Sequence, residues 1–119
     1  MFAAHRRLDN LTVIVDRNGL QIDGPTEKVV GLEPIADKWR AFNWNVICVD
    51  GHDHAKLLDA FEEAKQCTDR PTAIIANTVK GKGVSFMEDS PYWHGGIPTP
   101  QQFEAALAEL EQEARQWAA

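Results

Sequence analysis

This chain of 119 residues has few cysteines, the residues that form disulfides in small proteins and bind structural metals. Its two cysteines, Cys48 and Cys67, lie far apart, and no CxxC or cysteine–histidine spacing typical of a zinc site occurs. The sequence therefore predicts neither a disulfide framework nor a zinc site. Both thiols are interpreted as reduced and intracellular.

Long apolar runs and an excess of basic charge are also missing. No run approaches the roughly 20 apolar residues that span a bilayer. The first ten residues, MFAAHRRLDN, lack the apolar segment of a signal peptide. The formal net charge is −6, whereas a nucleic-acid-binding face is basic. We expect a cytoplasmic protein that binds neither membrane nor nucleic acid.

Hydrophobic residues make up 44% of the chain and include four tryptophans, which is enough for the core of one domain. Apolar runs alternate with segments of helical spacing. They predict strands over residues 11–15, 45–49 and 72–78, and helices over residues 1–8, 32–42, 55–67 and 101–117. Thr99 is the expected cap of the last helix, with Pro100 at its first position.

This alternation is typical of an α/β fold, in which a parallel sheet with right-handed crossovers is flanked by helices. The apolar spacing on the helices and the second strand predicts a core that contains Trp39, Phe42, Ile47 and Phe61. The polar segment over residues 16–25 is expected to be a loop.

The most informative polar stretch follows the first strand. Asp16, Asn18 and the carbonyls of the next turn are hard oxygen donors of the kind that Mg²⁺ and Ca²⁺ prefer. Because Asn is neutral, a metal held there also needs anionic ligands, such as a phosphate. The alternative is a simple turn in which Asn18 and Gly19 serve positive φ angles, and the local pattern favours that turn.

Three further stretches have both a functional and a structural interpretation. TVKGKGVSF over residues 78–86 is a weak phosphate site or a flexible loop. In YWHGG, His94 either donates a hydrogen bond to a phosphate or acts as a proton shuttle, or it is a histidine that satisfies backbone groups in an ordered loop. In DGHDH over residues 50–54, a metal site is less favoured than a helix cap by Asp53.

Four stretches resemble, in their residues and their order, the thiamine-diphosphate-binding domain of transketolases, in particular the N-terminal subunit of the split type. They are LDNLTVIVDRNGLQIDGPT, VDGHD, RPTAIIANTVKGKGVSFME and WHGGIP. The resemblance implies a partial, Rossmann-like thiamine-diphosphate-binding fold. It implies Mg²⁺ or Ca²⁺ held by the Asn18 side chain and the Leu20 carbonyl. It also implies that Gly19 shapes the turn beside the cofactor and that His94 acts catalytically near the diphosphate and the donor sugar.

The same resemblance implies a transferase of the pentose phosphate pathway that moves a two-carbon ketol unit between sugar phosphates. Its expected partners are the transketolase C-terminal subunit, sugar-phosphate substrates and further copies in an oligomer. "HGGIP" and "KGKG" favour transketolase over another thiamine-diphosphate enzyme, such as a sugar-phosphate synthase or a dehydrogenase component.

One departure from the family pattern is that no Gly-Asp-Gly, the family's first metal ligand, occurs here. In the family it lies upstream, before a helix that runs into a segment like FAAHRRLDNLTVIVD. Residues 1–119 are therefore expected to be a single, N-terminally truncated cofactor-binding domain that is inactive alone. The alternative is a catalytically inert remnant or interaction module that pairs with other chains through an exposed sheet edge.

Overall fold

The computed structural model describes the backbone of residues 1–117 and the side chains of residues 1–116. It divides into two compact units, of which the first comprises residues 1–18 and 31–78 and the second Gly19–Val30 with the chain from Val79 onward. Within the described residues, no helix combines the length and the apolar character needed to cross a membrane.

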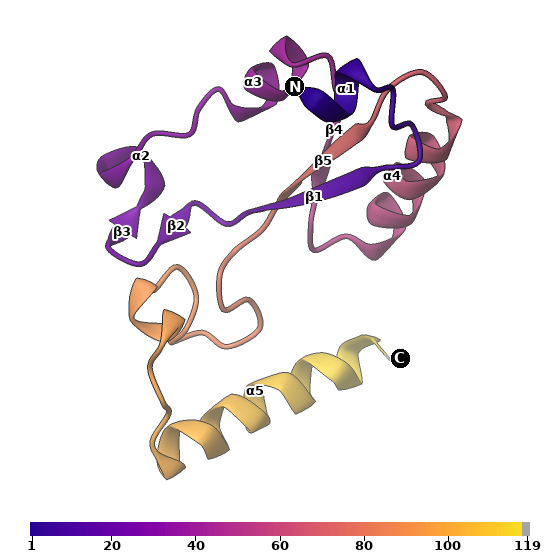
Figure 1. Ribbon diagram of the computed structural model, residues 1–119. Helices are drawn as coiled ribbons and strands as arrows, with labels where there is room; N and C mark the ends of the chain where they lie inside the picture. Colours follow the sequence, from indigo (N-terminus) through magenta and orange to yellow (C-terminus); the bar gives the residue numbers. More distant parts are fainter. Residues whose placement is uncertain (118–119) are drawn as a thin grey trace. The chain divides into compact units, whose positions relative to one another are not determined.

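A three-stranded parallel sheet forms the centre of the first unit (Figure 1). Its strands are β1 (Thr12–Arg17), β4 (Asn45–Asp50) and β5 (Thr72–Asn77), in the order β1-β5-β4. Both outer strands run parallel to β5, and Ile14 and Ile47 both pair with Ile74. The predicted α/β fold and parallel sheet are confirmed.

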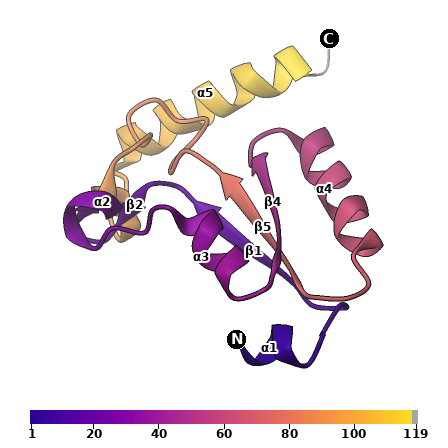
Figure 2. The same ribbon diagram turned by 90° about the horizontal axis from the view of Figure 1, so that it is seen from above.

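Two helices connect these strands as crossovers. Helix α3 (Ile35–Ala41) links β1 to β4, and α4 (His54–Gln66) links β4 to β5. They lie on opposite faces of the sheet (Figure 2), as right-handed crossovers require. A short helix, α1 (Phe2–His5), precedes β1.

The core lies between α4 and the sheet. Ala60 and Ala64 of α4 pack against Ile47 and Val49 of β4 and against Ile74 and Ala76 of β5, while Leu57 and Phe61 flank this cluster. Central strand β5 is buried from Thr72 to Ala76. Ile47 is therefore in the core as predicted, and Phe61 packs against the core while partly buried.

The prediction that Phe42 lies in the core is wrong, because 46% of its surface is exposed. Helix α3 ends at Ala41, and Asn43 turns the chain with φ of +63°. Phe42 is the C-cap of α3 and lines an apolar surface hollow with Trp39, so it stays on the apolar face of the helix while that face is incompletely covered. Trp44 is buried instead and meets half-buried Trp39 edge to face, with ring centroids 4.8 Å apart.

Three element boundaries differ from the predictions by two residues or more. Helix α1 ends at His5, three residues earlier than predicted. Strand β1 runs two residues further, because Asp16 and Arg17 still pair with Ala76 and Asn77 of β5. Helix α3 starts three residues later than predicted, because Pro34 has ψ of 102° and is the extended N-cap rather than a residue of the first turn.

The second unit contains a small hairpin and a long helix. Strands β2 (Leu20–Gln21) and β3 (Gly24–Pro25) pair antiparallel and lead into α2 (Thr26–Val29). The stretch predicted as a loop over residues 16–25 is thus the end of β1 followed by this hairpin. Hairpin formation is favoured by Gly24, whose φ of +135° suits glycine.

Helix α5 (Pro100–Trp117) starts as predicted. The Gln102 N–H donates to Thr99 Oγ1 at 3.3 Å, and the Thr99 N–H donates back to Gln102 Oε1 at 2.9 Å. This is a reciprocal capping box. The preceding loop is ordered by the 3₁₀ helix η1 (Pro91–His94) and by Trp93, whose Nε1–H donates to the Phe86 carbonyl at 3.0 Å.

Candidate functional site

The carboxyl ends of the three parallel strands meet at one edge of the first unit. In open α/β sheets, ligands bind outside this edge. The strand ends bring together a group of polar or small residues in the first unit: Asp16, Arg17, Asn18, Asp50, Gly51, Asn77 and Thr78. The predicted position of the site, after β1, therefore agrees with the general rule for this class of sheet.

Hydrogen bonds tie these strand ends to one another. The Thr78 hydroxyl donates to Asp16 Oδ1, and the Thr78 N–H donates to the Arg17 carbonyl at 3.3 Å. On the other side of β5, the Gly51 N–H donates to the Asn77 carbonyl at 2.8 Å. A side chain at Gly51 would collide with Thr78 and lie 3.1 Å from the Ala76 Cβ. The absence of a side chain at Gly51 thus allows its backbone to lie close to the end of β5.

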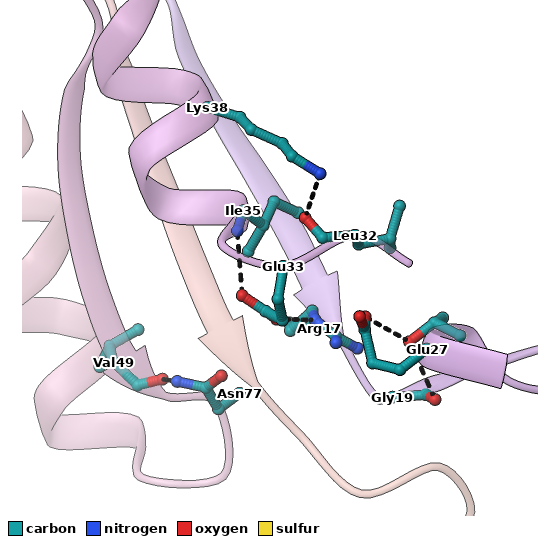
Figure 3. Close-up of polar contacts among 10 residues, drawn as sticks. Arg17, Gly19, Glu27, Leu32, Glu33, Ile35, Lys38, Val49 and Asn77 are labelled. Carbon is teal, nitrogen blue, oxygen red and sulfur yellow. Dashed lines mark hydrogen bonds and ion pairs between the residues drawn. The ribbon is translucent and has the colours of Figure 1, made fainter. Parts of the chain in front are cut away.

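An ion pair holds the side chain of Arg17 at the end of β1. Arg17 Nε donates to Glu33 Oε1 at 2.8 Å, and the Ile35 N–H donates to Glu33 Oε2 at 2.9 Å (Figure 3). The Ile35 N–H and the Arg17 guanidinium both stabilise the carboxylate, so they lower the pKa of Glu33 below its ordinary value.

The turn that starts the second unit is closed by Thr26. Gly19 has φ of +77°, in the left-handed region that favours glycine. Its carbonyl accepts the Thr26 N–H at 2.9 Å and the Thr26 hydroxyl at 3.3 Å. Because Thr26 is only 5% exposed, the Gly19 carbonyl is engaged inside the turn.

His94 lies in an exposed position at the end of η1. The segment around it is held by aromatic contacts, since the Trp93 ring meets Phe86 at 5.6 Å and Tyr92 at 5.0 Å between centroids. Gly96 lies so close to the Tyr92 ring that a side chain at position 96 would clash with it. The imidazole is thus presented on an ordered loop.

The predicted ligands are divided between the two units. Asn18 belongs to the first unit, as the last residue of its segment 1–18. Gly19, Leu20 and His94 belong to the second unit. The chain itself keeps Asn18 and Leu20 within about 7 Å of each other, because they are two residues apart. An amide oxygen and a backbone carbonyl are donors that suit Mg²⁺ or Ca²⁺.

Within residues 1–117, no three His, Cys, Asp or Glu side chains gather in a metal-binding group. A metal held by Asn18 and Leu20 would take its remaining, negatively charged ligands from a phosphate. The donor set therefore fits a metal that arrives with a diphosphate.

The choice between a cap and a metal ligand at Asp53 is settled in favour of the cap. Asp53 precedes α4 and its side chain accepts the Lys56 N–H at 3.1 Å. In contrast, no sequence pattern indicated the Arg17–Glu33 pair or the Thr26–Gly19 bonds. A carboxylate beside a proline and a threonine after Gly-Pro are too common to stand out in one sequence.

Comparisons with known proteins identify the family to which the chain is similar. The family model "Transketolase, thiamine diphosphate binding domain" matches residues 1–113. The 6-deoxy-6-sulfo-D-fructose transketolase subunit SqwG of Clostridium sp. (strain MSTE9) is 47% identical over 95% of this chain and 41% of its own length. An apulose-4-phosphate transketolase subunit of Phocaeicola vulgatus is 42% identical over 89% of this chain and 38% of its own length.

A solved transketolase from Campylobacter jejuni has the same fold, with a TM-score of 0.70 over 98% of this chain and 22% of that structure, at 24% identity. The chain spans about two fifths of the length of the two curated relatives, at 41% and 38%.

Proposed function

The chain belongs to the family of transketolase thiamine-diphosphate-binding domains, and we propose that it is part of the N-terminal subunit of a two-subunit transketolase. The observation that carries the proposal is the match over residues 1–113 to this family, together with relatives that are themselves transketolase subunits. The position of Asn18 directly after β1, where open α/β sheets bind ligands, supports it.

In this proposal the chain's own residues bind and orient the cofactor. The Asn18 side-chain oxygen and the Leu20 carbonyl hold Mg²⁺ or Ca²⁺, and the diphosphate supplies the negative charge that these neutral donors lack. Gly19 gives the turn its left-handed residue. His94 donates a hydrogen bond to the diphosphate or to the donor sugar. When bound, thiamine diphosphate supplies the nucleophilic carbon that carries the two-carbon unit.

Catalysis in this proposal belongs to the whole assembly. The curated relatives are more than twice as long as the matched region, which covers 41% and 38% of them. We infer that activity needs the additional length found in such relatives and the C-terminal subunit, whose pyrimidine-binding domain carries the activating glutamate of the family. An oligomer in the cytoplasm and a role in the pentose phosphate pathway belong to the same proposal.

The relatives also suggest a substrate class. One is named for a sulfonated ketose and the other for a ketose phosphate. Both names describe a ketose with an anionic group. We propose donor substrates of that class, a ketose that carries a phosphate or a sulfonate, for the transketolase to which this chain contributes.

A second candidate function is favoured by one observation. Among the described strands, β1 pairs only with β5, and its Ile14 is 52% exposed. An exposed edge strand with an apolar side chain invites pairing with another chain. The alternative is therefore a catalytically inert interaction module that uses this edge.

Calorimetric titration with thiamine diphosphate and Mg²⁺ tests the proposal. The isolated chain is expected to bind very weakly and to have no transketolase activity, because the acidic metal ligand of the family is missing. Addition of the rest of the N-terminal subunit and of the C-terminal subunit is expected to give binding and activity, and Asn18→Ala is expected to abolish cofactor binding in that assembly.

The matched control is Asn10→Ala, at an exposed asparagine before the opposite end of β1. It is expected to bind cofactor as the unmodified assembly does. An assembly that binds no cofactor would favour the interaction module. Micromolar binding by the isolated chain would contradict the expected weakness and make Asp16 the first residue to test as a replacement ligand.

A further inference from the structure

Glu33 bridges two elements next to the proposed metal ligand. One carboxylate oxygen accepts from Arg17, the last residue of β1, and the other accepts the Ile35 N–H at the start of α3. The Arg17 side chain is only 12% exposed, whereas that of Glu33 is 50% exposed. Figure 3 shows this bridge beside the end of β1. The guanidinium is thus largely enclosed, and Glu33 reaches it from the protein surface.

The segment that carries Glu33 is itself fixed. Lys38 Nζ, one turn into α3, donates to the Leu32 carbonyl at 2.9 Å. Glu33 therefore lies between two anchors, the Leu32 carbonyl on one side and the Ile35 N–H on the other. Its carboxylate thus accepts hydrogen bonds from both Arg17 and the Ile35 N–H.

The backbone of Arg17 is held as firmly as its side chain. Its carbonyl accepts the Thr78 N–H from the neighbouring strand's end at 3.3 Å. A peptide unit is planar, so a fixed Arg17 carbonyl also fixes the plane that contains the Asn18 nitrogen. Only the dihedral angles of Asn18 itself then remain to aim its side-chain amide.

We propose that Arg17 and Glu33 are positioning residues for the metal–diphosphate site. By holding the end of β1 against the start of α3, they fix the direction in which Asn18 presents its oxygen to the metal. This inference rests on the proposed function. Removal of a residue that orients a metal ligand typically weakens metal affinity by about 10–100-fold.

A purely structural role for the pair predicts something different. If Glu33 only fastens α3 to the sheet, its removal lowers the melting temperature and leaves the affinity of the folded protein for the metal–diphosphate unchanged. Affinity and melting temperature therefore have to be measured on the same variants.

The experiment compares Glu33→Ala and Arg17→Lys with Asp37→Ala in the assembled transketolase. Asp37 is the matched control, because it forms an exposed ion pair with Arg40 at 2.7 Å on the same helix and has no bond to β1. The dissociation constant for thiamine diphosphate is measured by calorimetry at several Mg²⁺ concentrations, and the melting temperature is measured without cofactor.

Glu33→Ala is expected to weaken binding by about tenfold or more, with the largest effect at low Mg²⁺. Arg17→Lys is expected to give a smaller loss, because lysine keeps the charge but not the planar fork of donors. Asp37→Ala is expected to bind within about twofold of the unmodified protein. If Glu33→Ala does not fold, Arg17→Lys alone carries the test, because it changes the other partner of the same ion pair.

Unchanged cofactor affinity in Glu33→Ala, or in Arg17→Lys where Glu33→Ala does not fold, would overturn the inference, even if the melting temperature fell. In that case the unmodified assembly still binds the cofactor, so the proposed function stands. If the unmodified assembly binds no thiamine diphosphate, the proposed function and this inference both fail. Equal weakening in Asp37→Ala would also overturn it, because the effect would then not be specific to the pair.

Discussion

The hydroxyl of Thr78 donates a hydrogen bond to Oδ1 of Asp16, and this bond joins residues that are 62 positions apart in the chain. It links the end of β1 to the residue that follows β5, at the edge where the proposed site lies. Asp16 therefore accepts a hydrogen bond from the neighbouring strand's end, in addition to its place before the turn. The proposed site thus rests on a surface that is tied together across strands.

Thr78→Val should remove this bond while nearly keeping the shape of the side chain. Removal of a hydrogen bond of this kind typically costs about 1 kcal/mol, and more where the acceptor is charged. We expect a lower urea midpoint with an unchanged slope. Thr78→Ser, which keeps the hydroxyl, should lose much less, and equal losses in the two variants would contradict the assignment.

Phe61 and Phe42 offer a paired test of the core. Phe61→Ala should destabilise the chain by about 3 kcal/mol, at the lower end of the range for buried phenylalanine, because Phe61 is only partly buried against the core. Phe42→Ala should cost less than about 1 kcal/mol, because Phe42 is 46% exposed. Chemical denaturation of both variants measures the difference, and a larger loss for Phe42→Ala would contradict the observed packing.

Gly19→Ala should destabilise the turn that follows Asn18. A Cβ in the left-handed region costs about 1–2 kcal/mol, and φ of Gly19 is +77°. Gly19→Asn should be better tolerated, since asparagine adopts this conformation more readily. Thermal unfolding of the two variants is the measurement. Equal melting of Gly19→Ala and the unmodified chain would show that the turn can relax.

The cap of α4 should make stability depend on pH in the acid range. The Lys56 backbone N–H and then its side chain lower the pKa of Asp53 below the ordinary 3.8. A carboxyl whose folded pKa is depressed stabilises the fold above its ordinary pKa, and this contribution is lost as the pH falls through the folded value. The difference in melting temperature between the unmodified chain and Asp53→Ala should therefore shrink below about pH 3.8.

The control for this pH dependence is Asp53→Asn, which still caps a helix but does not titrate. Its melting temperature relative to Asp53→Ala should change little over the same pH range. If the difference in melting temperature between the unmodified chain and Asp53→Ala does not change with pH, the charge of Asp53 contributes nothing to the cap.

Much of the fold could be predicted because its signals are local. The apolar runs over residues 45–49 and 72–78 are strands at nearly those bounds, and Thr99 caps α5 as its spacing indicates. At β1 the prediction failed because the cause was not local. Asp16 and Arg17 are polar, yet they extend β1 because β5 offers them partners.

The failure at Phe42 has a different reason. Its spacing continues the apolar face of α3, and Phe42 does line an apolar hollow there with Ile35 and Trp39, but 46% of its surface is exposed. Helical spacing predicts which face a side chain occupies and not how completely that face is covered. The site is a similar case. Asn18, Leu20 and His94 remain predictions from resemblance, whereas the Arg17–Glu33 pair joins residues 16 positions apart and has no local signature.

The strand order β1-β5-β4 has a consequence for how the protein is made. The first and second of these strands to leave the ribosome are not neighbours in the sheet, since β5 lies between them. A nascent chain that ends at Gln66 would hold β1 and β4 without β5, the strand that lies between them. Neither strand can form its parallel pairing with β5 before residues 72–77 have emerged.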